Sequence, residues 1–326
     1  MANTLDLARL ADRLGYHRYW VAEHHGTPML AGASPEVLIG PIAAATSRLR
    51  VGSGGVMLPH YSPLKVAECF SILSALFPGR IDLGVGRAPG TDRVTMFALQ
   101  RDRRQVPPDD FAEQLAELLA YLDDRFGPDD PFRRLAALPG GDERPEAWLL
   151  GSSSESAGWA AERGLPYAFA DFINPDPGAS VERYRAGFAG SEARGAPRVA
   201  VAVWAICAET DDEAHRLATS SRMSMTLLRR GLHIPVPPIE KAERFLAGGE
   251  EADERGPSGR RRRAVLGSPD TVRAGLQAVA AEYGAEEVIV VGITYDHAAR
   301  RRSYELIAEA FALAGAPPGA YVEATG

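Results

Sequence analysis

The chain has 326 residues, of which 45% are hydrophobic and 24% charged, and its formal net charge is −7 at pH 7. This composition is typical of a soluble globular enzyme with enough apolar residues for a large core. The acidic balance argues against nucleic acid as the main partner, because nucleic-acid-binding proteins concentrate positive charge.

Cysteine usage and the N-terminus indicate a reduced, cytoplasmic protein. Cys69 and Cys207 lie far apart in apolar runs, which favours packing roles over a disulfide scaffold. The N-terminus has no charged region followed by an apolar one, and no later segment is long and apolar enough to span a bilayer. We therefore predict no export and no membrane anchor.

Strands and helices alternate along the chain. The first predicted element is a helix over residues 4–14, where apolar residues recur at helical spacing up to Gly15. Short apolar runs then predict seven strands, near residues 17–23, 49–58, 81–87, 147–150, 165–169, 198–208 and 287–293. Further helices are predicted at about 35–46, 63–76, 111–126, 180–188, 211–230 and 303–314. Two more are predicted, one that ends at residue 163 and one that begins near residue 268.

Two tracts depart from this alternation. Residues 88–108 are rich in Arg, Asp and Pro and predict a rim insertion or lid. Residues 235–265 are rich in Pro, Gly and charge, and predict a mobile excursion with one helix near 239–246. Arg260 to Arg263 indicate a solvated charge cluster rather than a nucleic-acid patch. No linker divides the chain, so we expect residues 1–326 to form one domain.

This order of elements predicts a parallel sheet wrapped by helices. The fold class that we expect is α/β, a (β/α)8 TIM barrel that apparently lacks its first β-strand, because no strand precedes the first helix. A start assigned too late and a genuine loss of the strand both explain this pattern.

The segment Pro78–Gly90 carries the most specific local signal. An apolar strand there ends in Gly84, Gly86 and Arg87. The glycines permit the close approach of a backbone or a flat ligand, and the Arg87 guanidinium is a planar fork of donors suited to phosphate. A dinucleotide-binding fingerprint is disfavoured, because Pro89 stands where its third glycine belongs, whereas a barrel strand with structural glycines stays open.

Active sites of parallel barrels lie at the carboxyl ends of the strands. The residues that occupy such positions are His24, His25, Gly54, Gly55, Arg87, Ser153, Ser156 and Asp171. Adjacent strand residues point to opposite faces, so the two histidines are not expected to share a metal ion. One of them is expected to face the mouth as a proton donor or hydrogen-bond partner. The serine run before the helix suits both capping and anion binding.

Several motifs follow one another along nearly the whole chain: Tyr19–His25, Ser34–Ile39, Arg50–Leu58, Pro78–Gly90, Trp159–Pro166 and Gly267–Pro269. Together they resemble the bacterial luciferase-like flavin-dependent monooxygenases, and in particular the single-chain group that includes antibiotic-pathway oxygenases. The resemblance implies a (β/α)8 barrel that uses reduced FMN and O2. It implies that a flavin C4a-hydroperoxide inserts one oxygen atom into a small organic substrate.

The resemblance also implies roles for individual residues. His24 matches the active-site histidine beside the flavin and His25 its neighbour, while Gly54 and Gly55 match a cis peptide under the isoalloxazine ring. The phosphate binders that it implies are Arg87, Ser153 and Ser156. No second nucleotide site is visible, so NAD(P)H is expected to act through a separate flavin reductase. Dimerisation through barrel helices is a further expectation from the family.

Two other functions stay open at this point. A non-catalytic flavin-binding or luciferase-β-like protein would keep the phosphate site and lose catalysis; the missing strand favours it, whereas His24 and Glu23 count against it. An F420-dependent oxidoreductase of the same superfamily would transfer hydride without oxygen. The reactive cysteine of the luciferase α subunit is replaced here by Gly86, so no thiol chemistry is inferred.

Overall fold

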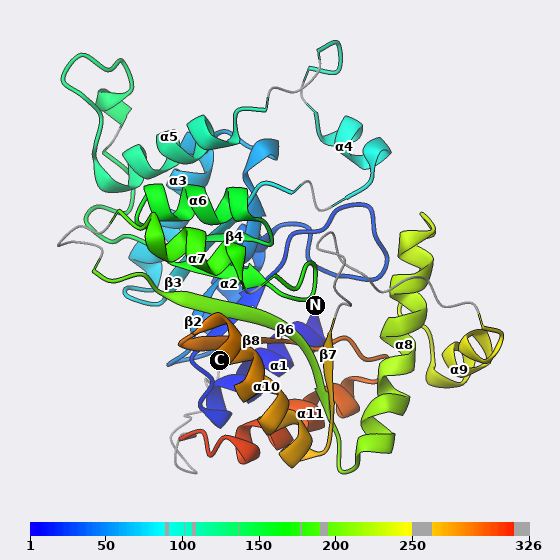
Figure 1. The fold of residues 1–326 in the computed structure, drawn as a ribbon. Coiled ribbons are helices and arrows are strands. Elements are labelled where there is room, and N and C mark those ends of the chain that lie inside the picture. Colours follow the sequence, from blue (N-terminus) through cyan, green and yellow to red (C-terminus); the bar gives the residue numbers. More distant parts are fainter. Residues whose placement is uncertain are drawn as a thin grey trace, which may run out of the picture.

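A computed structural model of the 326-residue chain describes residues 1–88, 91–100, 102–105, 109–135, 137–176, 178–189, 195–249 and 263–315. At its centre is one sheet of eight strands (Figure 1). The strands are β1 (Arg18–Val21), β2 (Arg50–Met57), β3 (Ile81–Gly86), β4 (Glu146–Gly151), β5 (Tyr167–Ala170), β6 (Val199–Cys207), β7 (Ala264–Gly267) and β8 (Glu287–Val291).

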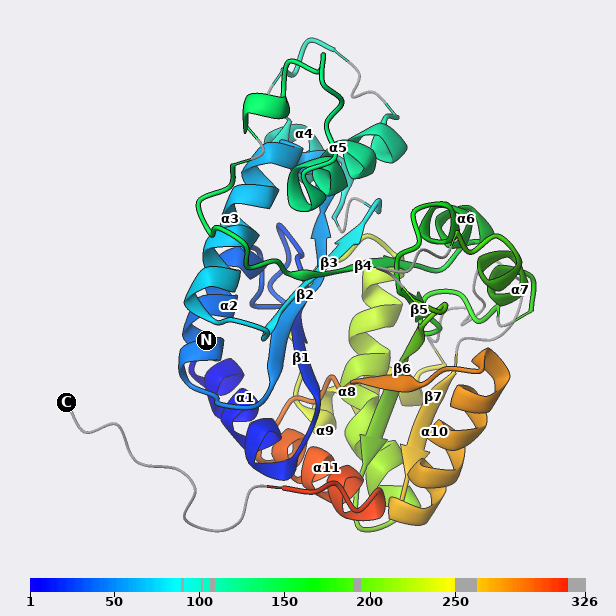
Figure 2. The same cartoon turned by 90° about the vertical axis from the view of Figure 1, so that its left-hand side faces the viewer.

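The sheet is parallel and curls on itself (Figure 2). Hydrogen-bonded neighbours run in order from β1 to β7, and β8 pairs with β6. The long strand β6 pairs with both β7 and β8, and its residue Trp204 is in register with Ala264 of β7 and with Val291 of β8. Within the described residues no pairing joins β1 to β8, so hydrogen bonds do not close the curl into a complete ring.

Helices occupy the connections between strands. They are α1 (Ala2–Leu14), α2 (Pro35–Ala44), α3 (Pro63–Leu76), α4 (Arg93–Leu99), α5 (Phe111–Asp123), α6 (Ser154–Glu162), α7 (Ala179–Ala186), α8 (Asp211–Arg229), α9 (Ile239–Ala247), α10 (Pro269–Tyr283) and α11 (His297–Ala310). The described residues also contain two short 3-10 helices, η1 (Leu58–His60) and η2 (Arg133–Leu135). Figure 2 shows α1, α2 and α3 along the outer side of β1 and β2.

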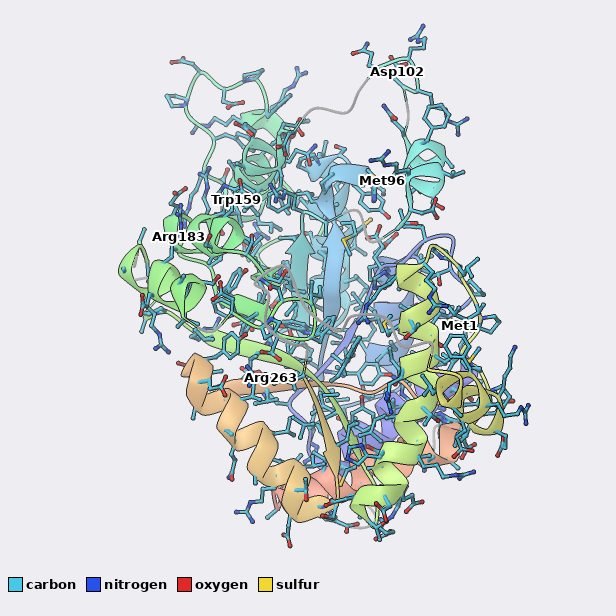
Figure 3. The ribbon with its side chains drawn as sticks, turned by 45° about the vertical axis from the view of Figure 1, so that its right-hand side comes forward. Met1, Met96, Asp102, Trp159, Arg183 and Arg263 are labelled. Atoms are coloured by element: carbon cyan, nitrogen blue, oxygen red, sulfur yellow. The ribbon has the colours of Figure 1, made fainter. Side chains whose placement is uncertain are left out.

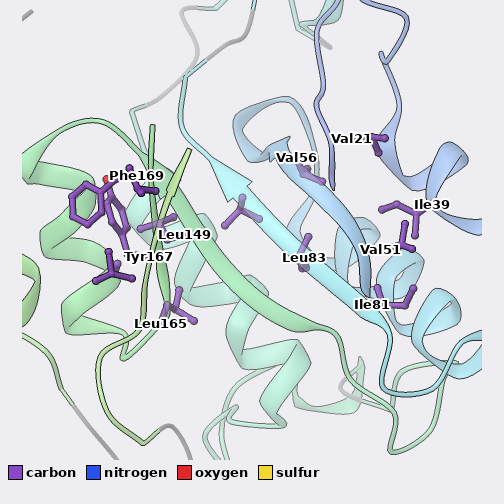
Figure 4. Close-up of a cluster of buried hydrophobic side chains, with 14 of the residues drawn as sticks. Val21, Ile39, Val51, Val56, Ile81, Leu83, Leu149, Leu165, Tyr167 and Phe169 are labelled. Carbon is purple, nitrogen blue, oxygen red and sulfur yellow. The ribbon is translucent and has the colours of Figure 1, made fainter. Parts of the chain in front are cut away.

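Alternation along the strands produces two apolar layers. The outer face packs against the helices, as Leu83 and Leu149 do in the cluster of Figure 4. The inner face holds a separate cluster that includes Trp148 and Ala200. Ile206 follows Ala200 on the same face of β6 and packs against α8. Helix α8 therefore covers the concave side of the sheet beyond the end of β6.

A network of charges lies at the amino ends of the strands. Asp82 of β3 is fully buried and accepts hydrogen bonds of 2.8 Å from Arg18 Nη1, Arg50 Nε and Trp20 Nε1. Arg18 also reaches Glu287 of β8 with two bonds, Nε–Oε2 at 2.7 Å and Nη2–Oε1 at 3.1 Å. This ion pair links the first strand to the last, where no backbone pairing exists in the described structure.

The predicted α/β architecture is confirmed, with a helix as its first element and all seven predicted strands present. One strand, β7, was missed, and α11 begins six residues earlier than predicted, because the Asp296 side chain caps it by accepting from Ala299 N. Ser34, Ser62 and Ser268 stand at the N-cap positions of α2, α3 and α10, but their hydroxyls make no capping bond.

The two irregular tracts are partly described. The tract 88–108 contains helix α4, which the sequence did not predict, and the tract 235–265 contains α9, which it did. Residues 250–262 lie outside the described residues. Among the described helices, none is both long and apolar enough to cross a bilayer.

Candidate active site

The carboxyl ends of β1 to β4 bring most of the candidate residues to one rim. Met57 at the end of β2 is in register with Gly86 at the end of β3, and Arg87 follows directly. Strand β4 is the next neighbour of β3, and α6 begins shortly after it. The two histidines follow β1 on the other side of β2. The glycines, Arg87 and the serine run therefore lie close together at the carboxyl ends of four neighbouring strands.

Glu23 organises the β1 end of this rim. Its carboxylate is fully buried and has three partners: His25 Nε2 at 2.7 Å, Tyr61 Oη at 2.9 Å and Met57 N at 2.9 Å. Burial raises the pKa of Tyr61, and the neighbouring Glu23 charge raises it further, so the phenol stays a donor. A buried carboxylate is tolerated only with such partners. Glu23 thus fixes the imidazole of His25 and ties β1 to β2.

The two histidines have different surroundings. The His25 ring also meets His60 edge to face, with centroids 6.0 Å apart, and its backbone oxygen accepts from Thr91 Oγ1 at 2.9 Å. The Thr91 bond attaches the tract before α4 to the rim. His24 donates its backbone N–H to Gly32 O at 2.8 Å, which closes the loop after β1. The carboxylate network holds His25, the neighbour of the histidine that the resemblance favoured.

The glycines of β2 and β3 serve two purposes. The peptide bond between Gly54 and Gly55 is cis. A Cβ at Gly55 would lie 2.8 Å from Gly84 O, and one at Gly84 would lie 2.2 Å from Ser53 O, so these glycines allow the two strands to approach closely. A Cβ at Gly86 would meet nothing nearer than Met57 Sδ at 3.8 Å. A side chain at position 86 would therefore make only ordinary van der Waals contacts, so the packing of the strands does not itself require glycine at the end of β3.

The third part of the rim is suited to an anion. Arg87 Nη1 lies 2.8 Å from Glu155 Oε2, and its guanidinium carbon lies 5.0 Å from the centre of the Trp159 ring (Figure 3 labels Trp159). Ser153 caps α6, because its Oγ accepts from Ser156 N at 3.3 Å. A guanidinium and the start of a helix thus converge, and both attract negative charge.

Ser156, also predicted to bind the phosphate, makes contacts within the chain. Its side chain is buried, and its Oγ lies 2.7 Å from Tyr167 Oη and donates to Ser153 O at 3.0 Å. These contacts anchor the first turn of α6 to β5. Of the two serines, Ser153 is the more exposed.

Asp171 at the end of β5 has a structural partner. Its buried carboxylate accepts from Arg263 Nε at 2.9 Å and Nη2 at 2.8 Å, and from Tyr283 Oη at 2.9 Å. The prediction of a solvated charge cluster is therefore wrong for Arg263 (Figure 3), whereas Arg260 to Arg262 lie outside the described residues. The pair fastens the chain just before β7 to the end of β5.

Sequence reasoning missed three members of the rim. Tyr61 follows η1 and carried no local signal, because its role depends on a contact between two strands. Glu155 lies inside the serine run, and Trp159 lies on the same face of the helix one turn later. This spacing could have indicated that both side chains contact one neighbour, which is Arg87. Glu23 was noticed only as a residue beside the histidines.

Comparison with known proteins identifies the chain's relatives. The family model for luciferase-like monooxygenases matches residues 1–287. A luciferase-like monooxygenase of Escherichia coli is 43% identical over 308 residues, which cover 94% of this chain and 89% of the relative. An N-acetyl-S-alkylcysteine monooxygenase of Bacillus subtilis is 44% identical over 250 residues, covering 76% and 73%.

Solved structures agree with this assignment. The apo-MsnO8 structure superposes with a TM-score of 0.84 at 44% identity, over 97% of this chain and 92% of that one. Two more distant structures share the fold alone. The oxygenating constituent of 3,6-diketocamphane monooxygenase from Pseudomonas putida, in complex with FMN, has a TM-score of 0.67 at 21% identity, over 94% of this chain and 90% of that one. An F420-dependent secondary alcohol dehydrogenase has a TM-score of 0.62 at 14% identity, over 93% and 94%. The chain thus belongs to the luciferase-like monooxygenase family.

Proposed function

We propose that this protein is a monooxygenase that uses reduced FMN and O2 to oxygenate a small organic molecule. One observation carries the proposal: the oriented histidine His25, the glycines at the ends of β2 and β3, and the cation Arg87 beside the start of α6 lie along a single rim. A flavin would need its ring system and its phosphate bound in that order. Family membership and the FMN-bound fold neighbour support it. We further propose that a separate NAD(P)H-dependent reductase supplies the reduced flavin.

The residues present fit FMN. Arg87 and backbone N–H groups at the start of α6 would bind the phosphate, with Ser153 beside them, and the absence of a side chain at Gly86 would leave room for the edge of the ring system. When bound, reduced FMN would supply the two electrons of the reaction, in which one oxygen atom of O2 enters the acceptor, the other is released as water and the flavin is left oxidised. The role of the protein is then to bind the flavin, to orient the acceptor and to shield the reaction from water.

His25 is suited to handling a proton in this site. Glu23 holds its Nε2, so Nδ1 is the ring atom left to accept or return a proton at the bound acceptor. Glu23 also stabilises the imidazolium whenever His25 carries both protons. Both His24 and His25 remain candidates for this role, and the carboxylate network favours His25.

The cofactor is tested first by equilibrium binding. Flavin fluorescence titrations with FMN, riboflavin and F420 should show FMN bound most tightly. Arg87→Ala should weaken FMN binding about 10- to 100-fold and leave riboflavin binding unchanged, since a charge-assisted bond to phosphate contributes about 1.5–3 kcal/mol. Arg133→Ala, an exposed arginine in η2, is the matched control and should change neither. Tight binding of F420 without FMN would replace the proposal with the hydride-transfer alternative that the F420-dependent fold neighbour represents.

The reaction class is tested with a thioether, because a relative is an N-acetyl-S-alkylcysteine monooxygenase. N-acetyl-S-methylcysteine, chemically reduced FMN and 18O2 should give a product with one labelled oxygen atom, detected by mass spectrometry. A protein that binds FMN but transfers no label to this probe would point to another acceptor. Binding without any acceleration of flavin oxidation over free FMN would favour the non-catalytic binder.

A further inference from the structure

The cation of the proposed phosphate site is already paired within the chain. Arg87 Nη1 and Glu155 Oε2 are 2.8 Å apart, and the side chains of Arg87 and Glu155 are 41% and 54% exposed. The pair therefore sits at the rim in contact with water, where it is accessible to an incoming anion. Any phosphate that binds Arg87 meets this carboxylate first.

The position of Glu155 explains why it occupies this site. It lies in the first turn of α6, where a negative charge interacts favourably with the helix dipole. A phosphate bound at the same turn would use the same dipole and the same guanidinium. Trp159 lies under the guanidinium at 5.0 Å and holds its plane in place for either anion. Glu155 thus has the charge and the location of a phosphate substitute.

We propose that Glu155 is an internal competitor for the flavin phosphate. The Glu155 carboxylate pairs with Arg87 until a dianionic phosphate displaces it. The phosphate therefore adds less to the affinity for FMN than it would if Arg87 were unpaired. Exposed ion pairs are weak, so displacement is easy, and the flavin can exchange between turnovers. This inference rests on the proposed function, since it assumes that FMN phosphate binds at Arg87.

The test compares FMN with riboflavin, which lacks the phosphate. Glu155→Gln should tighten FMN binding about three- to tenfold, the range expected when a weak competing ion pair and a like charge are removed. Riboflavin affinity should stay the same, because the competition acts only on the phosphate. Glu162→Gln, an exposed position at the other end of α6, is the matched control and should change neither affinity.

A double variant tests whether the effect passes through Arg87. In the Arg87→Ala background, Glu155→Gln should lose most of its benefit, because the guanidinium for which the two anions compete is gone. An unchanged benefit would mean simple charge repulsion and would overturn the competitor role. Equal affinity of wild type for FMN and riboflavin would instead refute the phosphate site itself. Wild-type preference for FMN with no gain in Glu155→Gln would refute only the inference.

Discussion

Glu23 is the most constrained residue of the rim. Among the described residues no arginine or lysine pairs with it, and two side-chain contacts and a backbone N–H balance its burial and fix one orientation of the carboxylate. Its effect on chemistry passes through His25, because the Glu23 carboxylate itself is enclosed. It is therefore a positioning residue for the proposed proton transfer.

Glu23→Gln should lower turnover about 10- to 100-fold while FMN affinity stays within about twofold. The reason is the loss of a charge-assisted bond of about 1.5–3 kcal/mol to the His25 ring, which stabilises the protonated imidazole. Steady-state rates and FMN titrations together provide the distinguishing readout, since a positioning role lowers turnover and leaves FMN affinity unchanged.

Tyr61→Phe is the companion variant for Glu23→Gln. It removes one donor from the same carboxylate but keeps the contact to His25, so its effect on turnover should be several-fold smaller. Equal loss of flavin affinity and turnover in Glu23→Gln would show that Glu23 merely supports the fold.

Individual residues of the site were predictable where one strand supplies them. His25, Arg87 and Ser153 each follow a predicted strand, and the parallel arrangement was enough to place them on one rim. The partners Tyr61 and Glu155 were not identified, because their roles come from contacts across strands, which leave no periodic signal in the sequence.

The pair Asp171 and Arg263 matters for how the elements are joined. Strand β7 follows the tract 250–262, and its first residue is in register with Trp204 of β6. Arg263 immediately precedes it and binds Asp171 at the end of β5. β7 itself, Ala264–Gly267, has four residues and no distinct alternation, so the pairing with β6 defines it more than its composition does.

Arg263→Met should destabilise the fold by about 3–5 kcal/mol, because it leaves the fully buried Asp171 carboxylate without its counter-charge. Urea unfolding followed by circular dichroism provides the measurement. Glu282→Gln is the control, because Glu282 is the exposed partner of the same guanidinium, 2.8 Å from Nη2, and its removal should cost less than about 1 kcal/mol. Equal effects of the two variants would show that burial of Asp171 contributes nothing.

The charge network at the amino ends of the strands includes Glu146 of β4, which binds Arg18 and Arg198 and makes the contribution of the network to stability sensitive to pH. Burial raises the pKa of Glu146, but the charges and hydrogen bonds of Arg18 and Arg198 outweigh this and lower it to about 2 from 4.5. A carboxyl whose pKa is lower in the folded state stabilises the fold above the unfolded value. That contribution is lost as the pH falls from about 4.5 towards 2.

Glu146→Gln should therefore be destabilising by about 1–3 kcal/mol at pH 7, and the difference from wild type should shrink at pH 3. Urea midpoints at pH 7, 4.5 and 3 check this trend. Glu143→Gln, an exposed neighbour in the preceding loop, should match wild type at every pH. A wild-type advantage that is the same at pH 3 as at pH 7 would contradict the assignment.

The overall architecture was predictable from alternation, whereas its closure was not. Seven apolar runs separated by helices require a parallel sheet and place the site at one edge. How far the sheet curls depends on twist summed over all strands and on contacts such as Arg18 to Glu287, which join residues 269 positions apart. No local pattern in the sequence predicts the total twist of the sheet or these long-range contacts.

The unpaired sides of β1 and β8 carry a consequence for association between molecules. Neither side has a partner strand in the described structure, although Val290 O of β8 accepts a hydrogen bond from Tyr304 Oη, and an unpaired strand edge is a template onto which an extended segment of another chain can add. Arg18 and Glu287 stand at the starts of these two strands with opposite charges and clasp one another. The ion pair between Arg18 and Glu287 therefore also disfavours the addition of a strand from another chain, and a variant that removes either charge should aggregate more readily.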